Sequence, residues 1–419
     1  MSSAFAKAAP VDVTIVMPCL NEAECLAACI ANAQEALVWM EETLGFAGEI
    51  LIADNGSTDG SQTLAQSLGA RVVDVRERGY GAALRGGATA ARGRYIVMGD
   101  ADGSYDFRDS VAMVRELSTG ADLCMGSRFK GGIAPGAMPW KNRYIGNPVL
   151  TGILNLLFRT GVSDAHCGLR AITRRCFETL RLSGAGMEFA SEMVVKAALL
   201  GVRIAEVPAT LSPDLRSRPP HLRPWRDGWR HLRYLMMLSP SGIFGIPALL
   251  LGGASLSLLL YAAWVSVSGG WGVSAIGNYW VILAGAMLGM SHVAGLIAAA
   301  SHLYGVREGY RRPSVWTSRM SRWVSLESML VSGAIFAIAG LAILFGVVAY
   351  WSAAQYASIV NVLPAVAGTS LIVVGMQNAL GGFLLAILNG NEAEFLRNIP
   401  SRDAASSATE ATPDSRRAA

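Results

Sequence analysis

The chain has 419 residues, of which 52% are hydrophobic and only 16% are charged, with a formal net charge of +4. This length allows two or three folded units, and so few charges are unusual for a protein that is soluble throughout. The small basic excess gives no indication of a nucleic-acid partner. Six cysteines at irregular spacing fit neither a disulfide framework nor a zinc site, and they are typical of a reduced cytoplasmic domain.

The first half of the chain predicts a nucleotide-binding α/β domain over residues 11–215. Residues 1–10 form a short tail without the apolar core of a signal peptide. Short apolar runs predict strands at 13–17, 49–53, 71–75, 95–98 and 121–125. Helical stretches of about ten or more residues lie between several of them, which indicates a mostly parallel sheet with helices on both faces. We expect Asn21 to cap the helix after the first strand, with Glu22 in its first turn.

Polar residues follow several of these strands, and the carboxyl ends of parallel strands are where open α/β sheets bind ligands. Asp54 follows the second strand, where it can accept hydrogen bonds from a base or a ribose. Gly79-Tyr80-Gly81 opens a helical stretch and permits a tight turn close to a ligand. Asp100 and Asp102 follow the fourth strand, and such a pair suits Mg²⁺ or Mn²⁺ on a diphosphate. An Asp-x-Asp alone is a weak signal, because a solvated loop explains it equally well.

Residues 216–240 predict an amphipathic juxtamembrane helix. Tryptophan and arginine recur there at helical spacing, offset by one position: Trp225 and Trp229, and Arg226, Arg230 and Arg233. A basic helix of this kind lies in the membrane interface with its aromatic residues at headgroup depth. The alternative is a helix packed on the soluble domain. Upstream, Glu188 and Glu192 share a helix face, from which one can approach a bound ligand or both can face solvent.

Residues 241–390 predict a transmembrane domain of four helices, near 242–266, 279–304, 328–351 and 359–388. Five arginines lie between the second and third helices, and the other two connections are uncharged. Because basic residues mark the cytoplasmic side of a membrane, we expect both termini and the N-terminal domain to lie in the cytoplasm, with the four helices in the inner (cytoplasmic) membrane. Residues 391–419 read as a disordered cytoplasmic tail. Gln377 and Asn378 are expected to hydrogen-bond between the helices.

Four segments together carry a resemblance to a known family: Val16–Glu22, Asp54–Asp59, Gly79–Leu84 and Asp100–Asp102. They resemble the family 2 inverting glycosyltransferases of GT-A fold. Gly126–Phe129, Asn142, Arg143, Asn147 and Asp164–Arg170 narrow the resemblance to polyprenyl-phosphate (dolichol-phosphate-type) hexosyltransferases, over about residues 11–235. One departure is Asn55, where the family usually has a second Asp. No Gln-x-x-Arg-Trp is seen, which favours transfer of a single sugar over polymer synthesis.

The resemblance implies a donor, an acceptor and a set of site residues. The donor is a UDP- or GDP-linked hexose, and the acceptor is a polyprenyl monophosphate. The implied nucleotide-sugar site comprises Pro18, Asn21, Glu22, Asp54, Gly79, Tyr80, Asp100, Ala101 and Asp102, with Mg²⁺ or Mn²⁺ on Asp100 and Asp102. Arg128 and Arg170 are expected to hold the two phosphates. Asp164 is expected to orient the acceptor or those arginines. The plainer readings are a surface arginine for Arg170 and a helix cap for Asp164.

Partners and rival functions follow from the same pattern. The transmembrane helices offer a surface for a homo-oligomer, and a polyprenyl-phosphate sugar needs a flippase and a lipid-sugar-dependent glycosyltransferase downstream. One rival is a membrane glycosyltransferase with a polysaccharide or another lipid, such as diacylglycerol, as acceptor. A second rival is a non-catalytic transporter or flippase subunit. The intact Asp100/Asp102 pair and the lack of charges within the spans argue against the second rival.

Overall fold

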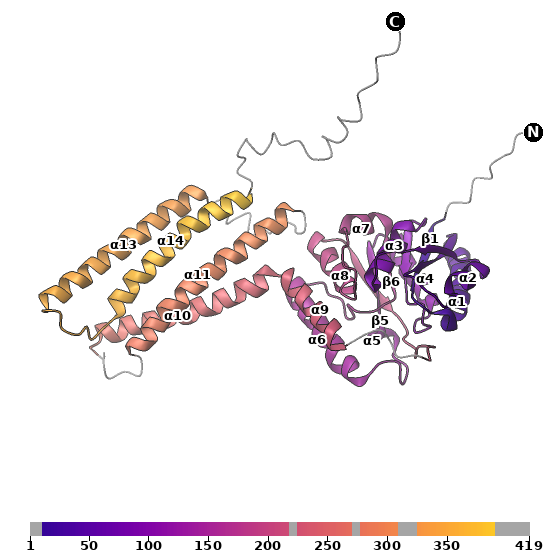
Figure 1. The fold of residues 1–419 in the computed structure, drawn as a ribbon, viewed down its shortest axis with the longest axis horizontal. Helices are drawn as coiled ribbons and strands as arrows, with labels where there is room; N and C mark the ends of the chain where they lie inside the picture. Colours follow the sequence, from indigo (N-terminus) through magenta and orange to yellow (C-terminus); the bar gives the residue numbers. More distant parts are fainter. Residues whose placement is uncertain (1–10, 218–223, 270–276, 309–324, 390–419) are drawn as a thin grey trace, which may run out of the picture. The chain divides into compact units, whose positions relative to one another are not determined.

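The computed structural model describes residues 11–217, 224–269, 277–308 and 325–389 (Figure 1). The chain divides into two compact units, one formed by Met1–Ile243 and the other by most of the chain from Phe244 onward. The tails predicted at 1–10 and 391–419 lie outside the described residues. Each unit is described by itself below.

The first unit is built on a seven-stranded sheet of order β3-β2-β1-β4-β6-β5-β7. Its strands are β1 (Val13–Cys19), β2 (Gly48–Asp54), β3 (Arg71–Asp74), β4 (Tyr95–Met98), β5 (Leu123–Ser127), β6 (Arg170–Thr173) and β7 (Ile204–Pro208). All pairs are parallel except those of β6, which runs antiparallel to β4 and β5. The predicted mostly parallel, GT-A-like sheet is confirmed. The two strands that the sequence did not predict are β6 and β7.

Helices cover both faces of this sheet (Figure 1). They are α1 (Ala23–Leu44), α2 (Ser61–Ser67), α3 (Tyr80–Ala90), α4 (Ser110–Ser118), α5 (Arg128–Gly131), α6 (Asn147–Phe158), α7 (Arg174–Leu180), α8 (Phe189–Leu200) and α9 (Pro224–Met237). The predicted amphipathic helix is α9. The side chain of Trp225 lies outside the described residues.

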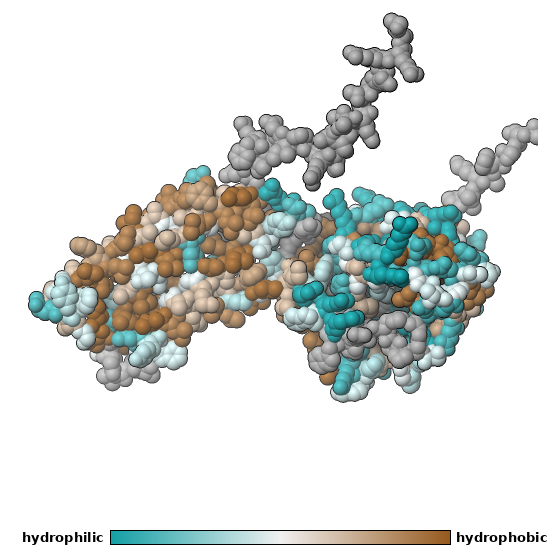
Figure 2. Space-filling model, viewed as in Figure 1, coloured by the Kyte–Doolittle hydropathy of each residue, from teal (hydrophilic) through white to brown (hydrophobic). Residues whose placement is uncertain are grey.

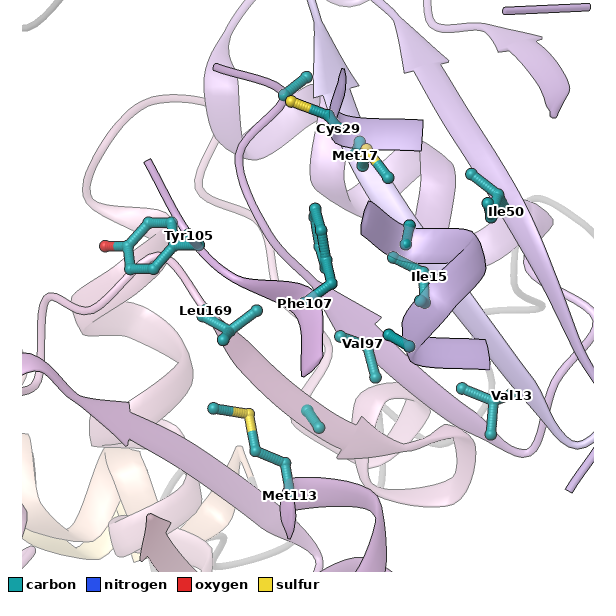
Figure 3. Packing of buried hydrophobic residues seen from close by; sticks show 14 of the residues in the cluster. Val13, Ile15, Met17, Cys29, Ile50, Val97, Tyr105, Phe107, Met113 and Leu169 are labelled. Atoms are coloured by element: carbon teal, nitrogen blue, oxygen red, sulfur yellow. The ribbon is translucent and has the colours of Figure 1, made fainter. Parts of the chain in front are cut away.

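The core lies on both sides of the sheet because successive strand side chains point to opposite faces. On one face, Ile15 and Met17 of β1 and Val97 of β4 lie near Phe107 and Leu169 (Figure 3). Neighbours in sequence such as Val16 and Ile96 pack on the other face with α3 and α8. Each fully buried side chain of this size contributes about 1.5–3 kcal/mol relative to exposure. Two packed faces therefore hold the carboxyl edge of the sheet in place.

The second unit contains four long apolar helices, α10 (Ile246–Val267), α11 (Asn278–Arg307), α13 (Leu326–Ala353) and α14 (Leu363–Asn389). Each is long and apolar enough to cross a bilayer, and little of each is buried within the protein. The face of this unit that Figure 2 shows is accordingly mostly hydrophobic. An apolar surface of this extent needs lipid around it. The four predicted spans are confirmed.

Small residues and amides join these helices. Gly333 of α13 and Gly375 of α14 meet so closely that a Cβ on either would press on the other's carbonyl oxygen. The amide Nδ2 of Asn378 donates to Ser332 Oγ at 2.7 Å, and Gln377 Oε1 lies 3.0 Å from His292 Nδ1. The predicted hydrogen bonds between helices are therefore confirmed, and both use α14 as the shared element.

Candidate active site

The predicted site residues converge on one edge of the sheet. Pro18 lies near the end of β1, and its register partner in β2 is Ala53, next to Asp54. Asp100 and Asp102 follow the neighbouring strand β4, and Tyr80 begins α3. Topology thus places side chains from four chain segments at the carboxyl ends of β1, β2 and β4, where α/β sheets bind ligands.

Asp100 and Asp102 are held in different ways. Tyr80 donates its hydroxyl to Asp100 Oδ1 at 2.9 Å. Ser104 donates both its main-chain N–H, at 3.0 Å, and its hydroxyl, at 2.6 Å, to Asp102 Oδ1. Burial, and then the neighbouring charge of Asp102, raise the pKa of Asp100 to about 6. The pair is thus a pre-positioned anionic site in which one carboxyl titrates close to neutrality.

This titration predicts a pH dependence for metal binding. Asp100 would bind a divalent ion only as the ionised carboxylate, so protons would compete with the ion below the raised pKa of Asp100. We expect Mn²⁺ affinity, measured by electron paramagnetic resonance without substrate, to change little above about pH 7. Below about pH 6 it should fall about tenfold per pH unit. Asp100→Asn should weaken binding and flatten this profile. An unchanged profile in that variant would assign the titration to another group.

Arg216 is the site residue that sequence reasoning missed. Its Nη2 lies 2.7 Å from Asp102 Oδ2 and its Nε lies 3.1 Å from Glu22 Oε2, so one guanidinium joins two buried carboxylates. The chain next to it is also fixed, because the N–H of Leu215 donates to the carbonyl of Asp102 at 2.9 Å. Arg216 is 114 positions from Asp102 in sequence, and only the fold brings them together.

The loop after β2 shapes the other side of the site. The main-chain N–H of Asn21 donates to Ser57 Oγ, and the side-chain Oδ1 of Asn21 accepts from the N–H of Thr58 at 2.8 Å. Asn21 has φ of 58°, a left-handed conformation that Asn tolerates well. The predicted capping role of Asn21 is wrong, because Asp59 accepts from the first helical N–H of α1, that of Ala23, at 2.9 Å. The cap comes from a neighbouring loop, which local sequence does not reveal.

Asn55 departs from the family pattern, and its contacts explain why an amide suits this position. Its Nδ2 donates to the carbonyl oxygens of Val75, at 2.9 Å, and Glu77, at 2.7 Å. Its Oδ1 accepts from the N–H of Gly79 at 2.8 Å. A carboxylate cannot donate to two carbonyls, so Asp would break the contacts that place Gly79. Asp54 beside it is fully buried and accepts from Gln62 Nε2 at 2.6 Å.

Arg128 and Asp164 form a buried ion pair. Arg128 Nε and Nη2 lie 2.7 and 2.8 Å from the two oxygens of Asp164, and the N–H of Arg128 also donates to Asp164. Asp164 has no exposed surface and Arg128 is 8% exposed. The helix-cap reading of Asp164 holds only for the short helix α5, from whose first N–H it accepts a hydrogen bond, and Asp164 also pairs with the guanidinium that it was expected to orient.

Arg170 is buried, with 1% of its surface exposed, so it is not a surface arginine. It lies in β6 and donates to the carbonyl oxygens of Ala190 and Cys167. Its positive charge lowers the pKa of Asp100, which burial and Asp102 raise. Arg170 is thus a buried cation close enough to Asp100 to lower its pKa, and its guanidinium has no open surface.

Two helices of this unit carry apolar side chains at the surface. Trp229 of α9 is 57% exposed, while His231 and Leu235 of the same helix are buried. The helix α6 packs against α9, and the segment around it exposes a second apolar set: Trp140, Tyr144, Ile145, Val149 and Leu156. Sequence reasoning missed this set because its residues are interleaved with Lys141, Arg143 and Asn147.

The residues that are present fit a divalent ion held jointly with a substrate. Within the described ranges, no group of three or more His, Cys, Asp or Glu side chains can hold a metal by itself. Mg²⁺ and Mn²⁺ accept one or two carboxylates and complete their shell with phosphate oxygens and water. Asp102 Oδ2 already faces a cationic group, Arg216, which shows that this position accommodates positive charge.

Comparison with known proteins agrees with a membrane-attached sugar transferase. Residues 14–181 match the glycosyl transferase family 2 domain, and residues 299–389 match the family 2 C-terminal transmembrane region. A low-salt glycan biosynthesis hexosyltransferase of Haloferax volcanii is 35% identical over 90% of this chain and 89% of its own length. The chain therefore belongs to glycosyl transferase family 2, and it is a glycosyltransferase.

Two further relatives resemble the catalytic unit. A dolichyl-phosphate hexose transferase of Haloferax volcanii is 26% identical over 47% of this chain and 81% of its own length. A polyprenol monophosphomannose synthase of Mycolicibacterium smegmatis is 28% identical over 47% of this chain and 76% of its own length. According to their names, these two similar proteins transfer sugars to polyprenol-type lipids.

Proposed function

We propose that the protein transfers one hexose, with inversion, from a UDP- or GDP-linked sugar to a polyprenyl monophosphate at the cytoplasmic face of the membrane. The observation that carries this proposal is the convergence of Asp100, Asp102, Glu22 and Arg216 at the carboxyl edge of a sheet in a chain with four apolar spans. The names of similar proteins support the choice of acceptor.

The proposed transfer requires neutralisation of the charge on the diphosphate and positioning of the donor and the acceptor. Asp100 and Asp102 would hold Mg²⁺ or Mn²⁺, which supplies neutralisation of the charge that develops on the leaving diphosphate. The nucleophile is a phosphate oxygen that is already ionised near neutral pH, so little general-base help is needed. Arg216 lies where it can release Asp102 and turn to a phosphate oxygen, and Tyr80 keeps Asp100 in place. The loop of residues 164–170 is held by the ion pair of Asp164 with Arg128 and by the hydrogen bond of Arg170 to Ala190.

A donor panel tests this function. Purified protein in lipid nanodiscs is incubated with polyprenyl phosphate and with UDP- and GDP-linked glucose, galactose, mannose and N-acetylglucosamine. One donor should give a product heavier than the acceptor by one sugar residue, with inverted anomeric configuration. Product on diacylglycerol or a polysaccharide instead would identify a different acceptor. No product with any donor or acceptor would contradict the enzymatic proposal.

The membrane orientation follows from the arginines around the spans. We propose that α9 and the apolar set around α6 rest on the cytoplasmic leaflet, because exposed aromatic residues next to basic ones suit the interface. Arg307 ends α11, four more arginines lie between α11 and α13, and the other two connections between spans carry no charge. The positive-inside rule then places both termini in the cytoplasm.

Reporter fusions check this topology. A reporter at the C-terminus should be active on the cytoplasmic side, and one inserted at Gly270, between the first two spans, should be active on the opposite side. Paired reporters with opposite requirements, such as green fluorescent protein and alkaline phosphatase, give complementary signals at each position. A C-terminal fusion that reports from outside the cytoplasm would rule out four spans with a cytoplasmic catalytic unit.

A further inference from the structure

A cavity with several charged side chains in its lining lies within the catalytic unit, between the loop 183–186 and α9. It has a volume of about 440 Å³, and its walls include Gly79, the loop 183–186 and four residues of α9. Arg78, Arg230 and Arg233 line it together with Glu188. Gly79 belongs to the same chain segment as the site described above, since the next residue, Tyr80, donates its hydroxyl to Asp100.

The wall formed by the loop 183–186 is fixed by its own contacts. Glu192 accepts from the N–H groups of Ser183, at 2.9 Å, and Gly184, at 2.7 Å. The N–H of Ala82 in α3 donates to the carbonyl of Ala185 at 3.1 Å. A Cβ at Gly79 would collide with that same carbonyl, so only glycine permits this approach. The cavity is thus bounded by an ordered wall of main chain on one side and by a helix on the other.

The charges of the cavity point to a doubly ionisable anion. Three guanidinium groups and one carboxylate give a formal net charge of +2. Glu188 Oε1 accepts from the N–H of Gly186 at 2.9 Å, whereas its buried Oε2 has no hydrogen-bond partner among the described residues. A phosphate monoester can meet both features, since its second ionisable oxygen carries either a negative charge for the arginines or a proton for Glu188. A phosphodiester has no such oxygen.

The covalent chain keeps this cavity near the membrane. Its α9 residues include Arg233, Tyr234 and Met237, and the first span begins at Gly242. Five residue steps separate Met237 from Gly242, which limits the distance between them to about 18 Å even when fully extended. An amphiphilic ligand whose head enters the cavity can therefore keep its apolar tail in the bilayer.

We propose that this arginine pocket, formed by Arg78, Arg230, Arg233 and Glu188, receives the phosphate monoester head of the lipid acceptor and rejects phosphodiester headgroups. The inference rests on the proposed function for the identity of the lipid. Beyond the proposed function, the pocket would select one class of lipid headgroup over another. Most lipids in the bilayer around the enzyme have phosphodiester headgroups. A pocket that requires a second ionisable oxygen would bind the rarer monoester lipid in preference to them.

Lipid competition in nanodiscs tests the pocket. The full chain is placed in phosphatidylcholine with equal small amounts of polyprenyl phosphate, phosphatidic acid (a monoester) and phosphatidylglycerol (a diester), and retained lipids are counted by native mass spectrometry. We expect both monoesters to be retained about tenfold over phosphatidylglycerol, the effect of one charge-assisted contact. Arg233→Ala should remove most of this preference. It should also raise the KM for polyprenyl phosphate about tenfold and leave the KM for the donor unchanged.

A matched control uses Arg226, an exposed arginine of the same helix that does not line the cavity. Arg226→Ala removes the same charge from α9 and should keep the monoester preference. Glu188→Gln should keep the fold and bind phosphatidylglycerol better than the wild type does.

Two results would overturn the proposal: equal retention of monoester and diester by the wild type, or equal behaviour of the two arginine variants. Failure of the proposed function looks different. In that case no donor gives a product on polyprenyl phosphate, and the lipid-retention measurement still decides on the pocket.

Discussion

Replacing Asp102 by Asn should slow hexose transfer about a hundredfold or more, which corresponds to a loss of about 3 kcal/mol of transition-state stabilisation. The substitution keeps the shape and the hydrogen bonds from Ser104 but removes the charge that faces Arg216 and, by our proposal, the metal. The charge that develops on the leaving diphosphate in the transition state is then neutralised less well. The value of kcat should therefore fall by a larger factor than the KM for the donor rises. Initial rates at saturating Mn²⁺ or Mg²⁺ measure this effect.

The matched control for this variant is Asp74→Asn. Asp74 ends β3 at the same edge of the sheet, and it is exposed to solvent. We expect near wild-type turnover from it, because an exposed carboxylate outside the site adds only a screened field. Near wild-type turnover in Asp102→Asn as well would refute the assignment of this carboxylate.

Asp164→Ala should destabilise the catalytic unit by about 3–5 kcal/mol, because it leaves the Arg128 guanidinium buried and uncompensated. For a unit of this size each kcal/mol corresponds to about 2–4 °C, so the unfolding transition should fall by about 6–20 °C. Arg128→Ala should be similarly damaging, since it leaves Asp164 buried and charged. Thermal scans of the full chain, followed by tryptophan fluorescence, measure the shift.

The double variant Arg128→Ala/Asp164→Ala separates stability from chemistry. With both charges removed, no buried ion lacks a partner, and the loss of stability should be smaller than the sum of the two single effects. If Arg128 serves the phosphates as well as the fold, the double variant should be folded and still transfer hexose at least about tenfold more slowly. Strictly additive losses would show that the two side chains do not act as a pair.

Much of the fold was readable from the sequence because its signals are local. Short apolar runs predicted β1 to β5, and long uncharged stretches predicted the four spans. The strand β6 was missed because its four residues, Arg170–Thr173, include only one large apolar side chain, that of Ile172. A strand with so few large apolar residues has no periodic pattern of its own.

The site was predictable where function imposes a motif and unpredictable where packing decides. Asp100 and Asp102 were found by their spacing after a strand. Arg216 was not, because it lies in a polar segment without a distinctive pattern and meets Glu22 and Asp102 only through the fold. The role of Asn55 also needed coordinates, since its three partners all belong to residues 75–79.

The place of Arg216 in the chain has a consequence for biogenesis. The sheet is complete only when β7 pairs with β5, and the Asp100–Asp102 turn is covered only when Leu215 and Arg216 reach it. All of these residues precede Gly242, where the first span begins. Domains fold as units, with the N-terminal one first during synthesis. The ribosome therefore delivers every catalytic group before any hydrophobic span, and the enzyme can assemble its site in water before the membrane takes up the rest of the polypeptide.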